Sequence, residues 1–137
     1  MKILIDTNVI LDAVLRREPH NVAAEKVFLL AAEDKVGAYI TASSITDIYY
    51  LTRKYIKDEG VVRQVLLKLF TLFNVLDVAR ADCEKALEFN MADYEDALLA
   101  ACAKRNKMDC IVTRNTKDFV NSPVKALMPD DFLNQLK

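Results

Sequence analysis

Apolar residues along the chain fall into two alternating patterns. Short continuous apolar runs, typical of strands buried on both faces, predict strands at 2–5, 37–41, 75–78, 109–113 and 124–127. Longer segments with apolar positions three and four residues apart predict helices at 8–17, 21–34, 43–58, 61–74, 80–89 and 93–107, and a last helix after Pro129. This alternation indicates an α/β fold with a central parallel sheet of about four or five strands, flanked by helices on both faces.

Size and composition predict one domain over residues 1–137. A chain of this length can bury one substantial core, and 53% hydrophobic with 28% charged residues is typical of a folded globular protein. The sequence has no signal-peptide pattern and no run of about 18 uncharged apolar residues, so we expect a cytoplasmic protein without a membrane span. Cys83, Cys102 and Cys110 show no CxxC spacing, and we expect them to be reduced core thiols.

Acidic and amide side chains follow the predicted strands or begin the helices next to them. Asp6 ends the first strand, and Asp47 lies in the first turn of the helix after the second. Ligands of such folds bind where parallel strands reach their carboxyl ends. We therefore expect one edge of the sheet to gather Asp6, Asp47, Asp93, Asp96, Asn115 and Asp118.

Each acid also has a purely structural interpretation as a helix cap. Asp6 can cap the helix that follows it, Ser44 with Asp47 resembles a capping box, and Asp93 can cap a helix whose first turn contains Asp96. Taken together, however, converging carboxylates repel one another by about 4 kcal/mol per pair at 4 Å and an effective dielectric near 20. The cluster as a whole therefore predicts a bound cation.

The ligand types narrow the choice of cation and of chemistry. Oxygen ligands favour Mg²⁺ or Mn²⁺, whereas the lone His20, on an expected surface turn, and scattered cysteines do not suit zinc. Mg²⁺ usually combines one or two carboxylates with phosphate oxygens, which indicates phosphoryl chemistry by a metal-activated water. The chain contains no GxxxxGK[ST], GxGxxG or GxSxG motif that would indicate another mechanism.

Three stretches together resemble the PIN domain family of small metal-dependent nucleases, which includes the VapC-type toxins of bacterial toxin–antitoxin pairs. They are ILIDTNVILD at 3–12, SSITDIYY at 43–50 and DYEDALLAACAKRNKMDCIVTRNTKDF at 93–119. The resemblance covers nearly the whole chain. It implies an endoribonuclease that cleaves RNA with Mg²⁺ or Mn²⁺, often as a homodimer, and is inhibited by an antitoxin whose tail occupies the acidic groove.

The resemblance also assigns roles to residues. The first three metal-binding acids of the family correspond to Asp6, Asp47 and Asp96, and Asn8 takes the accompanying polar position. Asp93 lies one turn before Asp96 on the same helix face, where it either joins the metal site or only caps the helix.

The fourth acid of the family usually follows a strand that ends in Thr, in a T-x-D pattern. Here Thr113 is followed two residues later by Asn115, which departs from that pattern, so Asp118 is the alternative source of a carboxylate. In the same loop, Arg114 and Lys117 are candidates for binding the phosphates of the substrate, and Asn8 and Thr113 complete the expected substrate-binding set. The acids that the resemblance assigns to catalysis are then Asp6, Asp47, Asp96 and Asp118.

Three other interpretations compete with a nuclease. A PIN fold without catalytic activity, serving as a binding module for RNA or protein, is favoured by Asn115. A receiver domain of two-component signalling needs an adjacent acidic pair after the first strand, but here Asp6 stands alone. A haloacid-dehalogenase-like phosphatase needs an acid two residues after the first, where this chain has Asn8.

Overall fold

The sheet of the protein is parallel throughout, and its central strand is the first in the sequence. The computed structural model describes residues 1–136. The strand order is β3-β2-β1-β4-β5, and the central strand pairs Ile3 with Ala38 on one side and Cys110 on the other. This topology confirms the predicted α/β fold. The strands are β1 (Lys2–Ile5), β2 (Gly37–Thr41), β3 (Asn74–Leu76), β4 (Cys110–Val112) and β5 (Ala126–Leu127).

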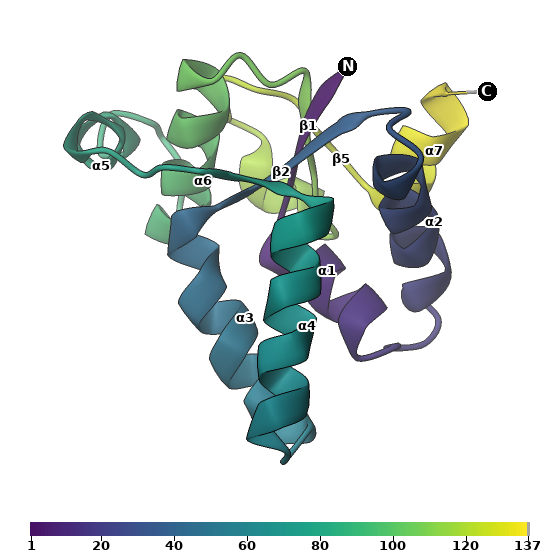
Figure 1. Ribbon diagram of the computed structural model, residues 1–137. Coiled ribbons are helices and arrows are strands. Elements are labelled where there is room, and N and C mark those ends of the chain that lie inside the picture. The colour runs from purple at the N-terminus through teal and green to yellow at the C-terminus, as the bar shows by residue number, and fades with distance from the viewer. Residues whose placement is uncertain (137) are drawn as a thin grey trace.

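Helices cover both faces of this sheet (Figure 1). One face carries α1 (Thr7–Val14), α2 (Asn21–Ala32), α3 (Ala42–Tyr55), α4 (Glu59–Leu72) and α7 (Pro129–Gln135). The other face carries α5 (Arg80–Ala86), α6 (Tyr94–Arg105) and the 3₁₀ turn η1 (Thr116–Phe119). Within residues 1–136, no helix combines the length and the apolar character that a membrane span requires.

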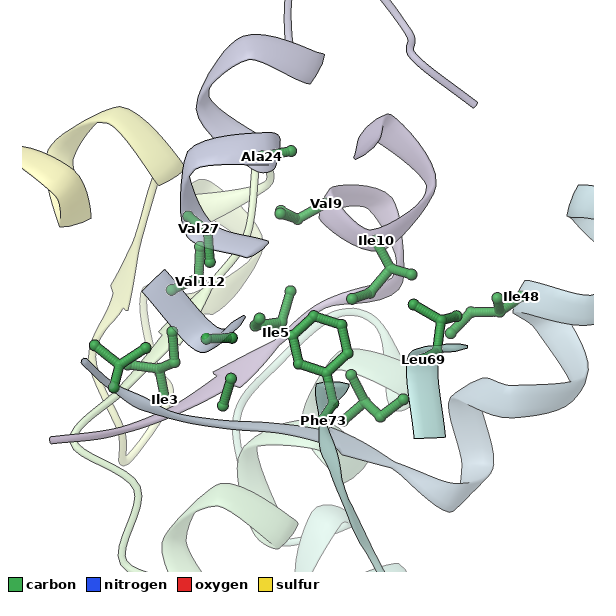
Figure 2. Packing of buried hydrophobic residues seen from close by; sticks show 14 of the residues in the cluster. Ile3, Ile5, Val9, Ile10, Ala24, Val27, Ile48, Leu69, Phe73 and Val112 are labelled. Carbon is green, nitrogen blue, oxygen red and sulfur yellow. The ribbon is translucent and has the colours of Figure 1, made fainter. Parts of the chain in front are cut away.

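The alternation of side chains along β1 explains why its run of apolar residues is continuous. Ile3 and Ile5 point to one face and pack with Ile10 of α1 and with Phe73, as Figure 2 shows. Leu4 points to the opposite face and packs with Leu99 of α6. A strand buried on both faces has no position for a polar side chain until it ends, and β1 ends immediately before Asp6.

Several element ends differ from the sequence prediction. The helix predicted at 8–17 begins at Thr7 and ends at Val14, because the backbone turns through a left-handed conformation at Arg16. The helix predicted at 43–58 ends at Tyr55, since Asp58 caps the next helix by accepting a hydrogen bond from the Val61 N–H.

The last part of the sheet is also shorter than predicted. The strand expected at 124–127 pairs only from Ala126, because Ser122 Oγ forms hydrogen bonds with both the C=O and the N–H of Val124. The strand expected at 75–78 spans Asn74–Leu76, and the loop predicted at 114–118 contains η1.

A buried ion pair holds α6 against α5. The carboxylate of Asp82, which is 2% exposed, accepts hydrogen bonds from Nε and Nη2 of Arg105 at 2.8 and 2.9 Å and from the Ala79 N–H. The Arg105 guanidinium therefore keeps the pKa of Asp82 below its usual range, although burial acts in the opposite direction. Cys102, a free buried thiol, also contacts this carboxylate.

We predict that Asp82→Asn lowers the free energy of unfolding by about 2–3 kcal/mol at pH 7, because Arg105 loses its charged acceptor. Urea denaturation measures this loss. Since the folded-state pKa of Asp82 is lowered, the ion pair contributes fully above the unfolded pKa near 3.9, and its contribution disappears as pH falls through the lower folded value. The control is Glu84→Gln, which removes an exposed pair with Arg80 and should cost less than about 0.5 kcal/mol. Equal losses in the two variants would contradict the prediction.

Candidate active site

A cavity of about 430 Å³ opens at the carboxyl edge of the sheet. Three helices, α1, α3 and α6, begin near this edge, so the positive ends of their dipoles lie where the cavity is. Side chains of both charges line it. The acids among them are Asp6, Asp47, Glu95 and Asp96, and the bases are Arg17 and Arg114.

Asp6 is fixed in place from both sides of its carboxylate. Oδ1 accepts a hydrogen bond from the Thr7 N–H at 2.8 Å, and Oδ2 accepts one from Thr113 Oγ1 at 2.8 Å. Its backbone N–H extends the pairing between β1 and β4 by donating to the Val112 C=O. Burial still raises the pKa of Asp6; the two hydrogen bonds oppose this effect and the charge of Asp93 adds to it. The helix-cap interpretation is therefore correct, and it leaves the carboxylate facing the cavity.

Thr113 connects the polar side chains at the ends of β1 and β4. Its buried hydroxyl donates to Asp6 and accepts from the Asn115 N–H at 3.1 Å. Asn8 Nδ2 lies 3.4 Å from the same hydroxyl, and Asn8 Oδ1 accepts from the Arg114 N–H. Thr113 and Asn8 thus orient Asp6 and the loop after β4.

The acid of α3 lies farther along its helix than predicted. The helix begins at Ala42 with Thr41 as its N-cap, and the Thr41 hydroxyl forms hydrogen bonds with the hydroxyls of Ser43 and Ser44. The predicted capping box of Ser44 and Asp47 is therefore wrong, because the chain enters the helix earlier. Asp47 lies in the second turn, not the first, and its exposed side chain lines the cavity.

The first turn of α6 supplies two further acids to the cavity. Asp93 is the N-cap, and its carboxylate accepts a hydrogen bond from the Asp96 N–H at 3.1 Å. Glu95 and Asp96 line the cavity itself, whereas Asp93 acts on it through its charge.

Desolvation and repulsion make the carboxyl group of Asp96 resist ionisation. Burial, and then the charges of Asp6, Asp93, Asp118 and Glu95, raise its pKa to about 7. The pKa of Glu95 is raised by desolvation and by other carboxylates of the cluster. Burial is the largest cause of both shifts and the neighbouring carboxylates add to it, so ionisation of these two acids is disfavoured unless a cation binds.

The comparisons with known proteins identify the fold. A family model described as PIN domain matches residues 2–117. The chain belongs to the PIN domain family. A comparison with curated proteins found no match.

Solved structures share this PIN fold at low sequence identity. VapBC2 from Rickettsia felis, bound to a DNA fragment from their promoter, aligns with a TM-score of 0.72 and 17% identity, over 93% of this chain and 98% of that one. A toxin–antitoxin complex from Klebsiella pneumoniae gives 0.67 and 23%, over 92% and 96%. Mycobacterium tuberculosis VapC20, a sarcin–ricin loop cleaving toxin, gives 0.67 and 14%, over 90% and 98%.

The donor set of this PIN domain suits a hard divalent cation. The cavity presents carboxylate, hydroxyl and amide oxygens, and neither His20 nor a cysteine lines it. Among residues 1–136, no three His, Cys, Asp or Glu side chains converge closely enough to hold one ion together. The carboxylates are spread along the cavity, an arrangement that matches an ion held by one or two of them together with water.

The loop after β4 is divided between two cavities. Arg114 lines the acidic cavity, whereas Lys117 and Asp118 line a neighbouring one beside Asn90 and Asn121. Asn115 is exposed and lines neither of the two. The structure therefore places Asp6, Asp47 and Asp96 together and leaves the other predicted ligands at the margin of the cavity.

The sequence analysis missed two residues that line the cavity, Glu95 and Arg17, and also Asp12, a buried acid that binds Arg17 without lining the cavity. Glu95 is adjacent to Asp96 in the same helical turn, which is a signal that could have found it. Asp12 interrupts an apolar stretch of α1, and an arginine follows five residues later. Its burial, at 1% exposed, follows only from the tertiary structure.

We predict that Asp96→Asn raises the melting temperature of the metal-free protein at pH 8 by about 3 °C or more. The Asp96 carboxyl group has a pKa of about 7 in the folded protein and about 3.9 when unfolded, so ionisation at pH 8 destabilises the fold. This cost is absent below the unfolded pKa and is complete above the folded one. The gain should therefore shrink as the pH falls from 8 toward 4.

Thermal denaturation in EDTA at several pH values measures this difference. The control is Glu33→Gln, which removes an exposed carboxylate paired with Lys35 outside the cavity and should leave the melting temperature within about 1 °C. A lower melting temperature of Asp96→Asn than of the wild type at pH 8 would contradict the prediction.

Proposed function

We propose that this PIN domain is a metal-dependent endoribonuclease, the toxin of a toxin–antitoxin pair, that hydrolyses RNA phosphodiester bonds. The observation that carries the proposal is the group of four carboxylates on one cavity, with the pKa of Asp96 raised to about 7. Such a cluster is costly unless it binds a cation, and a PIN fold shared with a sarcin–ricin loop cleaving toxin supports RNA as the substrate class.

In this proposal, Asp6 and Asp96 would hold Mg²⁺ or Mn²⁺ directly, because both are partly buried, line the same cavity and act on each other through their charges. Asp47 is exposed and would bind through water, and Asp93 and Asn115 would complete the outer ligands. When bound, the ion supplies charge stabilisation for the reacting phosphate and lowers the pKa of an attacking water.

The remaining residues would orient the acids and the substrate. The Thr113 hydroxyl holds Asp6 in one orientation, and Asn8 keeps the loop after β4 close to it. Arg114 lines the cavity and would contact a phosphate of the RNA. Lys117 lines the neighbouring cavity and would contact a phosphate farther along the same RNA. Asp118 would take the place of the fourth family acid, since its charge already acts on Asp96.

A second candidate function is a catalytically inactive PIN-fold module that binds RNA or protein. The observation that favours it is Asn115, an amide at the position of the fourth family acid, which lines neither cavity beside it. A measurement of nuclease activity separates the two candidates.

We predict that the purified protein cleaves members of a mixed RNA set with Mg²⁺ or Mn²⁺ and not in EDTA. Asp6→Asn and Asp96→Asn should each lower the rate by about 100-fold or more, because each removes a charge that acts on the reacting phosphate. Gel electrophoresis of end-labelled RNA measures the rates. Glu33→Gln is the control that should retain activity, since Glu33 lies outside the cavity.

Two further variants in the same assay test the fourth acid. Asp118→Asn should lower the rate by about 10-fold or more, as expected for a group beside the metal ligands, and Asn115→Ala should change it less. The nuclease proposal is wrong if the folded protein, supplied with metal and free of antitoxin, cleaves none of the RNAs. The inactive binding module would then be the better proposal.

The partners proposed for this protein are a second copy of the chain and an antitoxin. Exposed apolar side chains occur on α3 and α4, among them Tyr50, Tyr55, Leu67 and Phe70. A separate apolar cavity of about 300 Å³ lies between α1, α2 and α4. The VapBC2 and Klebsiella pneumoniae structures are toxin–antitoxin assemblies with the same fold, which supports a protein partner here.

We predict that co-expression with the reading frame adjacent to its gene yields a stable complex that contains two copies of this chain and no longer cleaves RNA. Light scattering measures the mass, and the RNA assay measures the inhibition. The reason is that exposed apolar area of this kind is stabilised by burial against a partner. A monomer of about 15.5 kDa that is unaffected by the neighbouring gene product would contradict this prediction.

A further inference from the structure

A buried carboxylate holds two arginines on the wall of the acidic cavity. Asp12 of α1 is 1% exposed, and its Oδ1 accepts a hydrogen bond from Arg17 Nε at 2.8 Å. Its Oδ2 accepts one from Arg114 Nε, and Arg114 Nη2 lies 3.2 Å from Oδ1. Arg17 also donates through Nη2 to the Asn8 C=O at 3.0 Å. The two guanidinium groups come from distant parts of the chain and are fixed on the same carboxylate.

The arginines retain donors that face away from Asp12. Each uses Nε and Nη2 within the cluster, and within residues 1–136 the Nη1 group of neither has an acceptor. Arg17 and Arg114 are 37% and 26% exposed, and both line the cavity that contains the four carboxylates. Asp12 itself is buried and does not line the cavity, so a ligand in the cavity would contact the arginines and not their carboxylate.

The charges of this cluster do not cancel. Two guanidinium groups and one carboxylate leave one positive charge on one wall of a cavity whose other wall is acidic. A neutral or cationic ligand gains no attraction from the two guanidinium groups. A phosphodiester matches them in charge and in the forked geometry of its oxygens. Because Asp12 holds both groups in place, little side-chain freedom is lost when the anion binds.

We propose that Asp12 positions Arg17 and Arg114 as a paired binding site for a backbone phosphate of RNA next to the one that is cleaved. The inference rests on the proposed function for its substrate class, and it adds Arg17 as a binding residue and Asp12 as a positioning residue. Asp6 and the acids of α3 and α6 would then hold the ion at the reacting phosphate, and the arginine pair would bind the adjacent phosphate of the RNA.

A purely structural role is the competing explanation. The same contacts join the end of α1 to the loop after β4, so the cluster could serve folding alone. The two explanations differ in the salt dependence of RNA binding, because a phosphate contact releases counterions and a buried structural pair does not.

The experiment measures binding of a fluorescein-labelled single-stranded RNA of mixed sequence to the inactive Asp6→Asn protein, by anisotropy between about 50 and 200 mM salt. Adding Arg17→Gln should weaken binding about 3- to 10-fold and lower the slope of log Kd against log salt by about 1. The matched control is Arg16→Gln, which removes the same charge from a neighbouring side chain that does not line the acidic cavity, and it should change neither quantity as much.

Asp12→Asn tests the positioning role. This variant makes the protein more positive, so a general charge effect would tighten RNA binding, whereas loss of positioning should weaken it about 3-fold or more. Circular dichroism confirms that each variant is folded, and Arg17→Gln decides the question if Asp12→Asn does not fold.

The inference is overturned if Arg17→Gln and Arg16→Gln have the same affinity and salt slope, or if the folded Asp6→Asn protein binds no RNA. Cleavage is a separate readout. A wild-type protein that cleaves no RNA, while the Asp6→Asn protein binds RNA through Arg17, would refute the nuclease and retain the arginine site.

Discussion

Repulsion between carboxylates at the carboxyl edge of the sheet is the constraint on which the rest of this structure depends. Asp6 follows a strand buried on both faces, and Asp96 lines the same cavity with a pKa that burial and the neighbouring carboxylates raise to about 7. The protein offsets part of this cost with the hydrogen bond from Thr113 and with the positive ends of three helix dipoles. Arg17 and Arg114 share one buried carboxylate, Asp12, and offset only part of the charge of the four cavity carboxylates, so the edge remains a site for a cation.

The acids keep their positions because buried polar contacts hold the elements that carry them. Asp82 and Arg105 fix α6 against α5, and α6 brings Glu95 and Asp96 to the cavity. Asp12 holds the end of α1 to the loop after β4 in the same manner. A buried carboxylate with two or more strong donors is costly to disrupt, so these contacts favour one arrangement of the helices around the cavity.

The cavity presents two kinds of charged group, the four carboxylates and the two arginines. The carboxylates favour a divalent ion, and the arginines favour a phosphate that the ion does not neutralise. The PIN fold places both kinds of group at the carboxyl edge of the sheet, where α/β proteins bind ligands. The similar solved structures establish the fold at 14–23% identity, and the proposal for RNA combines that fold with the charged residues of this chain.

The sequence by itself determined the strands, most helices and the edge of the sheet at which Asp6, Asp47 and Asp96 lie, because periodicity and the polar end of each buried strand are local properties. It misplaced the start of α3, where Thr41 in place of Ser44 became the cap. Only the tertiary structure decided that Asp118 lies on a separate cavity and that Arg17 and Arg114 share one buried acid. The contact between Asp12 and Arg114 joins residues 102 positions apart, and no local pattern in the sequence specifies which distant segments meet.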